Sequence, residues 1–204
     1  DEDDNYGTKT WTVNAVALSI SATIDDTAIN TGPLVFRYTP IGNNIEKTIH
    51  FLIDNEEIAT ASVTASGRQQ TQSIPAQSHG AHRLKVYATA TVDGVSVTSN
   101  TLEYDIIWAE AGNSTPIIAC SFTGSATQYS TVAIPYQVYN PASLTASITL
   151  AVNGVVVSTQ TVDRTRQTWN YKADTAGTDT LTITCGSVVK TITLQVASSG
   201  VDIE

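Results

Sequence analysis

Residues 148–156 read Ile148-Thr149-Leu150-Ala151-Val152-Asn153-Gly154-Val155-Val156. The first five residues alternate between large apolar side chains and small or polar ones, which is typical of a strand with one buried face. The Asn-Gly pair that follows tolerates the positive φ angles of a two-residue hairpin turn. The stretch therefore predicts a β-hairpin whose return strand covers residues 155–162.

Two further hairpins are predicted in the first half of the chain. Residues 47–53 alternate in the same way, and Asp54-Asn55-Glu56 turns the chain into a strand that continues to residue 64. Asp93-Gly94 is a second strong turn signal, followed by a return strand that we expect to run unbroken from Val95 to Ile106.

The chain contains the same unit twice. Three pairs of segments match at offsets of 98, 97 and 101 residues: 51–58 with 149–156, 80–86 with 177–183, and Tyr38-Thr39-Pro40 with Tyr139-Asn140-Pro141. A near-constant offset across separated segments indicates an internal duplication of about a hundred residues.

Composition favours strands throughout. The 204 residues include 32 Thr, 19 Val and 18 Ile, whose branched Cβ atoms suit a pleated sheet better than a helix. Short alternating segments separated by turns every ten or so residues are the pattern of an immunoglobulin-like sandwich. The fold class predicted is all-β, with two tandem immunoglobulin-like antiparallel β-sandwiches.

Polar, Gly-containing stretches divide the chain. We expect five parts: an acidic N-terminal tail (1–9), a first immunoglobulin-like domain (10–109), a linker (110–115), a second domain (116–197), and a further linker or the start of another element (198–204). The chain has no Met, not even at position 1, and residues 198–204 resemble a linker and the start of another element, so we expect a fragment of a longer modular protein.

Charge and hydropathy exclude two classes of partner. The net charge is -9, whereas a nucleic-acid surface needs clustered Lys and Arg. No apolar run is long enough to span a membrane, so membrane insertion is not expected. The charge is uneven: residues 1–110 carry 14 acidic and 6 basic side chains, and residues 111–204 carry 5 and 4. The nearly neutral second half is the better contact surface, because its desolvation costs less.

The two copies resemble bacterial and phage immunoglobulin-like repeats. The likeness is carried by residues 139–144, by the hairpin at 152–154 and by residues 80–84, and it extends over nearly the whole chain. Such a resemblance implies a structural or interaction module of a virion (tail or fibre) or of a bacterial surface. It also implies other virion or surface proteins as partners, homo-oligomers among the options, and a location in the virion or outside the cell.

No arrangement of residues indicates catalysis, and we expect no enzyme, no cofactor and no metal site. His79 and His82 are two possible ligands, but no third ligand lies near them in the sequence. The acidic turns at Asp25-Asp26 and Asp54–Glu57 offer oxygen ligands without the spacing of a calcium loop. We interpret them as solvated turns.

Aromatic residues support an alternative function, binding of carbohydrate or of a host surface. Trp169 and Tyr171 lie on one face of a short predicted strand, where exposed rings would stack on sugars. The competing interpretation places these rings in the core. Trp11 and Trp108 lie near the domain ends, and for Trp108 we expect packing at the junction.

Cys120 and Cys185 both fall on inward-facing positions of the second unit. A disulfide between the two sheets and a pair of buried thiols both fit this placement. Their counterparts in the first unit, near Ala22 and at Ala88, are not cysteines, so the fold does not need the bridge.

Overall fold

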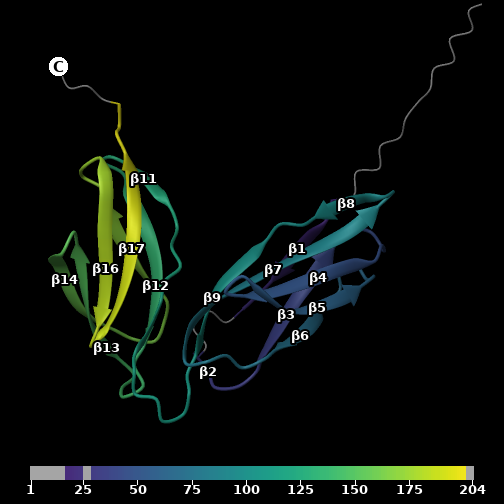
Figure 1. Cartoon of the computed structure of the whole chain (residues 1–204), viewed down its shortest axis with the longest axis horizontal. Coiled ribbons are helices and arrows are strands. Elements are labelled where there is room, and N and C mark those ends of the chain that lie inside the picture. The colour runs from purple at the N-terminus through teal and green to yellow at the C-terminus, as the bar shows by residue number, and fades with distance from the viewer. Residues whose placement is uncertain (1–16, 25–28, 201–204) are drawn as a thin grey trace, which may run out of the picture.

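The computed structural model describes residues 17–24 and 29–200, which contain strands and no helix (Figure 1). The first group of strands is β1 (Ser19–Ala22), β2 (Ile29–Asn30), β3 (Leu34–Ile41), β4 (Lys47–Ile53), β5 (Glu56–Val63), β6 (Gln70–Ile74), β7 (Gly80–Val92), β8 (Val95–Thr98) and β9 (Leu102–Trp108). The second group is β10 (Ile117–Ala119), β11 (Ser125–Thr127), β12 (Thr131–Tyr139), β13 (Ala146–Val152), β14 (Val155–Val162), β15 (Gln167–Lys172), β16 (Gly177–Cys185) and β17 (Val188–Ala197).

Each group forms a sandwich with the same strand order. In the first, the sheet β1-β3-β6 faces the sheet β2-β9-β7-β4-β5, with β8 added beside β7. In the second, β10-β12-β15 faces β11-β17-β16-β13-β14. Apart from β2 on β9 and β11 on β17, all pairings are antiparallel. The predicted fold class, two tandem immunoglobulin-like sandwiches, is confirmed.

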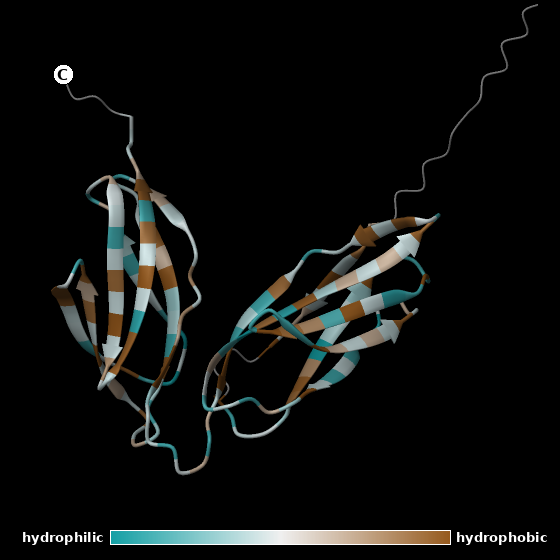
Figure 2. Cartoon of the chain, viewed as in Figure 1, coloured by the Kyte–Doolittle hydropathy of each residue, from teal (hydrophilic) through white to brown (hydrophobic). Residues whose placement is uncertain are grey.

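The alternation predicted from the sequence builds both cores. Along β4 every second residue is buried, and β16 and β17 show the same period, visible as alternating bands in Figure 2. The first core lies around Phe36, Tyr38 and Phe51, whose rings contact one another. The second core forms around Ile134 and Tyr136 of β12.

The structure corrects two of the three offsets proposed for the duplication. The turn residues with positive φ are Asp54-Asn55 and Asn153-Gly154, an offset of 99 rather than 98. The buried counterpart of Tyr38 is Tyr136 rather than Tyr139, because Tyr38 and Tyr136 are both 2% exposed in the central strand of a three-stranded sheet. The offset of this pair is therefore 98 rather than 101. A shift of one residue would turn every buried side chain of the hairpin outward.

The return strand predicted from Val95 to Ile106 is broken into β8 and β9. At the break, the side-chain amide of Asn100 donates to the carbonyl of Ile20 and its oxygen accepts from the Ile20 amide, at 2.9 Å each. The hydroxyl of Ser99 accepts from the amide of Ala88 at 2.8 Å. These bonds replace the ladder locally and fasten β1 of one sheet to the facing sheet.

Three expectations fall outside the described residues: the acidic tail (1–9), the placement of Trp11, and the turn at Asp25-Asp26. Across residues 17–24 and 29–200, no helix is long and apolar enough to cross a membrane.

Candidate functional site

The junction between the two sandwiches has a small apolar core of its own. Ile107 at the end of β9 is buried against Ile117 and Ala119 of β10, and Ile29 and Tyr139 pack on this cluster. Ile107 and Trp108 are adjacent on β9, so their side chains point to opposite faces of the strand. The side chain of Ile107 faces the junction, and that of Trp108 faces the first core. The junction buries apolar side chains contributed by both sandwiches.

Polar contacts flank this apolar cluster. Arg83 on β7 donates from one guanidinium nitrogen to the carboxylate of Asp105 on β9, at 3.1 Å, and to the hydroxyl of Ser121 in the second sandwich. The backbone amide of Ser121 donates to the other oxygen of Asp105 at 3.2 Å. An ion pair of the first sandwich therefore holds both the side chain and the backbone of one residue in the second.

Glu103 and Lys85 extend this charge network along the surface of the first sandwich. Arg83 donates to Glu103 at 2.7 Å, and Lys85 lies 3.4 Å from the same carboxylate. The hydrogen bond from Arg83 lowers the pKa of Glu103 below its usual value. Among the described residues, Lys85 forms its ion pair with Glu103 and makes none with the second sandwich, so the junction uses only the inner part of the network.

The linker is tied to the first sandwich by His79. Its Nδ1 accepts a hydrogen bond from the amide of Glu110 at 3.1 Å, and its Nε2 lies 2.9 Å from the carbonyl of Thr115. The imidazole of His79 therefore contacts the backbone at both ends of the linker. Asn113 closes the turn within the linker by accepting from the amide of Thr115.

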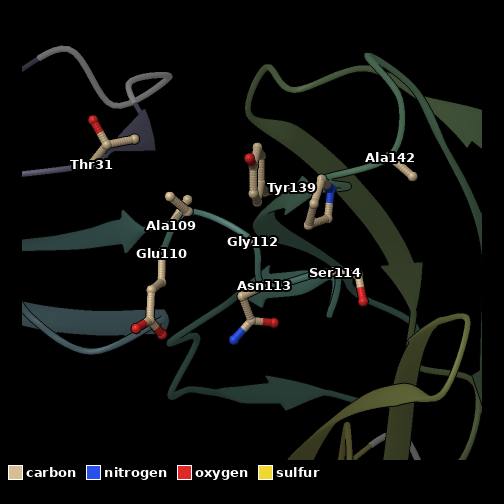
Figure 3. Close-up of a pocket in the computed structure, with 10 residues that line it drawn as sticks. Thr31, Ala109, Glu110, Gly112, Asn113, Ser114, Tyr139 and Ala142 are labelled. Carbon is tan, nitrogen blue, oxygen red and sulfur yellow. The ribbon is translucent and has the colours of Figure 1, made fainter.

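A cavity of about 360 Å³ lies beside the linker, where both sandwiches contribute to its walls (Figure 3). Thr31 lines it from the first sandwich, Tyr139 from the second, and Glu110 and Asn113 from the linker. The guanidinium of Arg164 lies 4.8 Å from the centre of the Tyr139 ring, on the second-sandwich side of this wall.

The expectation that Trp108 packs at the junction is wrong. Trp108 is buried in the first core, its indole N–H donates to the carbonyl of Gly32 at 3.0 Å, and its ring meets His82 edge-on. The preceding residue, Ile107, takes the junction position. Strand alternation makes these two placements mutually exclusive, and the sequence alone does not say which side chain faces which core.

Trp169 and Tyr171 border a groove of about 440 Å³ between β14 and β15, the two edge strands on one side of the second sandwich. Trp169 is 8% exposed and belongs to the second core, whereas Tyr171 is partly buried, and the two rings meet edge-to-face. The structure thus places Trp169 mainly as a core residue, with the groove passing beside it.

A buried carboxylate holds Tyr171 in place. The Tyr171 hydroxyl donates to Asp179 on β16 at 2.6 Å, and the other oxygen of Asp179 accepts from the side-chain amide of Asn153 at 2.9 Å. Burial, followed by the hydrogen bond to Asp179, raises the pKa of Tyr171 to about 12. The β13–β14 turn and the groove are therefore parts of one hydrogen-bonded unit.

The second sandwich has an exposed apolar edge that was not predicted from the sequence. Val155, Val156 and Val157 begin β14 and are 67%, 60% and 54% exposed. Within the described residues β14 pairs with β13 alone, so its other edge is open. The signal was available in the sequence, because residues 155–162 carry no charge while the matching strand of the first unit begins Glu56-Glu57.

Cys120 and Cys185 are buried in the second core as free thiols. Of the two alternatives, the structure contains the thiol pair. Burial raises the pKa of both side chains, which keeps them protonated near neutral pH.

The candidate ligands are used in structural contacts. His82 pairs with Asp54 at 2.7 Å, and the same carboxylate accepts from the amide of Arg83 at 2.8 Å. His50 lies between Glu57 and Thr89 on the outer face of its sheet. No group of three or more His, Cys, Asp or Glu suited to a metal occurs in the part of the chain that the structure describes.

No family model matches the chain, and no curated protein matches it. Similar solved structures include the fibronectin(III)-like modules of CbhA from Clostridium thermocellum, at 14% identity, a TM-score of 0.33, and coverage of 90% of this chain and 98% of that one. The titin domains Z1Z2 in complex with telethonin show 13% identity, a TM-score of 0.29, and coverage of 93% and 98%. The central fibronectin-III array of RIM-binding protein shows 15% identity, a TM-score of 0.29, and coverage of 93% and 64%.

At this level of similarity, the class of the protein comes from its own strand order and cores. The chain is a tandem pair of immunoglobulin-like β-sandwich modules.

Proposed function

We propose that this chain is a non-enzymatic spacer, whose two sandwiches are independent folding domains (10–109 and 116–197) held at one angle. The observation that carries the proposal is the hydrogen bonding of Ser121 to Arg83 and Asp105 beside a buried apolar cluster. A junction with both kinds of contact resists bending, and sandwiches of stiff β-branched strands transmit position along the chain.

The setting proposed for this spacer is a phage virion (tail or fibre) or the surface of a bacterial cell. Its support is the resemblance of residues 139–144 and 80–84 to repeats of those proteins. The partners would be neighbouring virion or surface proteins. Copurification of the full chain with such assemblies from its natural source tests this setting.

Small-angle X-ray scattering tests the rigid junction. For the unaltered chain we expect one fixed arrangement of the two sandwiches, with a single well-defined maximum dimension. Arg83→Ala removes the side chain that donates to both Asp105 and Ser121, and should broaden the distribution of distances between the sandwiches. Lys85→Ala is the matched control, because Lys85 shares the carboxylate of Glu103 but, within the described part of the chain, forms no ion pair with the second sandwich. A distribution of distances between the sandwiches that is equally broad in the unaltered chain and in both variants would contradict the spacer role.

A second candidate function is binding of carbohydrate or a host surface at the groove beside Trp169 and Tyr171. The observation favouring it is the groove itself, since an aromatic wall with Asn170 and Gln160 nearby combines a stacking surface with amides that bind hydroxyl groups. A glycan array with the full chain tests it. Binding should disappear in Tyr171→Ala and persist in Tyr129→Ala, which alters a 55% exposed tyrosine outside the groove.

A further inference from the structure

The open edge of β14 lacks the charged residues and prolines that protect many edge strands, although its register with β13 shifts at Val157, which forms a β-bulge. Natural sheets block strand addition with charged residues, proline or a covering loop, because an edge presents unpaired backbone donors and acceptors. Residues 155–162 read Val-Val-Val-Ser-Thr-Gln-Thr-Val, without charge or proline over the whole of β14. Its first three side chains are more than half exposed.

The first sandwich provides an internal comparison. Its matching edge strand, β5, begins with the exposed pair Glu56-Glu57 at the positions of Val155 and Val156. Glu57 is paired with His50 at 2.6 Å, and Ser62 further along the strand donates to Glu46 at 2.7 Å. Two copies of one unit thus differ in the protection of the same edge, which is charged in one and apolar in the other.

We propose that β14 is a self-association edge, which pairs antiparallel with β14 of a second copy of this chain. A twofold axis would join the two five-stranded sheets into one continuous sheet. Figure 1 shows β14 on the flank of the second sandwich that faces away from the first, and no strand within residues 17–24 and 29–200 covers its open edge.

The charge distribution favours a second copy as the occupant, bound through the second sandwich. Residues 111–204 carry 5 acidic and 4 basic side chains, a net charge of -1, whereas residues 1–110 carry 14 and 6, a net charge of -8. Two second sandwiches therefore approach with little repulsion, while contact through the first sandwiches would bring two strongly acidic surfaces together. The uncharged β14 places no like charges opposite each other in antiparallel self-pairing.

The groove beside β14 extends the contact beyond the backbone. Val157, Ser158 and Gln160 line the groove from β14, facing Trp169 and Tyr171. A strand added to β14 continues the sheet, and every second side chain of that strand points toward the open side of the groove. Backbone pairing would supply affinity and these alternate side chains would supply register, as in other cases of strand addition.

Sedimentation velocity of the full chain, over micromolar to millimolar concentrations, tests the proposal. We expect a monomer–dimer equilibrium. Val155→Glu/Val156→Glu gives the second unit the Glu56-Glu57 pair of the first, and should weaken dimerisation by about tenfold or more. Leu144→Glu is the control for added charge and lost apolar surface, because Leu144 is 72% exposed in a loop, and it should leave the equilibrium unchanged.

Hydrogen exchange locates the contact. At dimer-forming concentrations, amides of residues 155–162 should gain protection while those of β5 should not. A chain that remains monomeric at every concentration, a dimer that the double Glu variant leaves intact, or protection elsewhere than β14 would each overturn the proposal. None of these results bears on the stiffness of the junction, which scattering measures separately.

Discussion

Arg83 in the first sandwich donates a hydrogen bond to the hydroxyl of Ser121 in the second, across 38 positions of the chain. Asp105 accepts hydrogen bonds from both of these residues. A carboxylate and a guanidinium of the first sandwich therefore both bind Ser121 of the second. The junction is therefore organised by residues that lie far apart in sequence, beside the apolar contact of Ile107 with Ile117.

The apolar part of the junction should contribute to stability separately from either core. Ile117→Ala removes a buried side chain from the cluster it forms with Ile107 and Ala119, and we expect a loss of about 2 kcal/mol in the free energy of unfolding. Urea denaturation measures this loss. Ile41→Ala, at a 45% exposed position, should change stability by less than about 0.5 kcal/mol. Equal effects of the two substitutions would count against a packed junction.

Lys47 should be essential to the first sandwich although no carboxylate of the described residues pairs with it. Its buried ammonium donates to the carbonyls of Asn43, Ile45 and Thr64 at 2.8, 2.9 and 3.1 Å, and burial lowers its pKa. Lys47→Ala leaves these carbonyls without a partner and opens a cavity, which should cost about 3 kcal/mol or more.

Urea denaturation with tryptophan fluorescence measures the loss caused by Lys47→Ala. The control, Lys85→Ala, removes a lysine at the surface of the same sandwich and should cost less than about 1 kcal/mol. A loss as small as that of the control would show that the buried ammonium does not stabilise the fold.

The hydrogen bond from Tyr171 to Asp179 should stabilise the protein only while the phenol is protonated. The folded pKa of about 12 lies above the value of 10.0 for an unperturbed tyrosine, so the contribution is complete below about pH 10 and is lost as pH rises toward 12. At about pH 8, Tyr171→Phe should cost about 2 kcal/mol, because it leaves a buried carboxylate oxygen without this partner.

Denaturation as a function of pH tests this window. The difference in the free energy of unfolding between the unaltered chain and Tyr171→Phe should decrease steadily above about pH 10. A difference that stays constant up to the alkaline limit would mean that the phenol does not supply it.

Asn100 should hold the two sheets of the first sandwich together at their edge. Asn100→Ala leaves the amide and the carbonyl of Ile20 unpaired, with an expected cost of about 2 kcal/mol. Hydrogen exchange at the Ile20 amide should accelerate in this variant. Ser96→Ala, at an exposed position of β8, is the control and should leave exchange at Ile20 unchanged.

Both thiols should be unreactive in the folded protein. Cys120 and Cys185 are buried and their pKa values are raised, so a thiol reagent at neutral pH should modify neither until denaturant is added. In denaturant, two equivalents of thiol per chain should react quickly with the reagent. Fewer than two after denaturation without a reductant would indicate a disulfide.

Local patterns were sufficient to predict the fold. The Asn153-Gly154 and Asp93-Gly94 turns were found because positive φ restricts which residues can stand there, and the strands were found because alternation separates two faces. The predicted offset at the 54–55 turn, 98, is one residue short of the observed 99. The two copies share a similar pattern of polar and apolar residues, which aligns about equally well in either register.

The candidate site was predicted less well, because it depends on contacts between distant residues. The groove is lined by the edge strands β14 and β15 of opposite sheets, and Trp169 is buried because it packs in the core between those sheets. The break between β8 and β9 depends on Asn100 meeting Ile20, 80 positions away. No local sequence pattern around Asn100 or Ile20 predicts the hydrogen bonds between them.

The sequence by itself determined that this chain folds twice into the same β-sandwich, because backbone propensity and two-residue periodicity act over a few neighbouring positions. Only the tertiary structure decided that Ile107 rather than Trp108 faces the junction, that Ser121 is held by Arg83 and Asp105, and that β14 presents an open apolar edge. These features depend on which surfaces meet when separate strands pack, and that outcome is set by the combined burial of many residues rather than by any one segment.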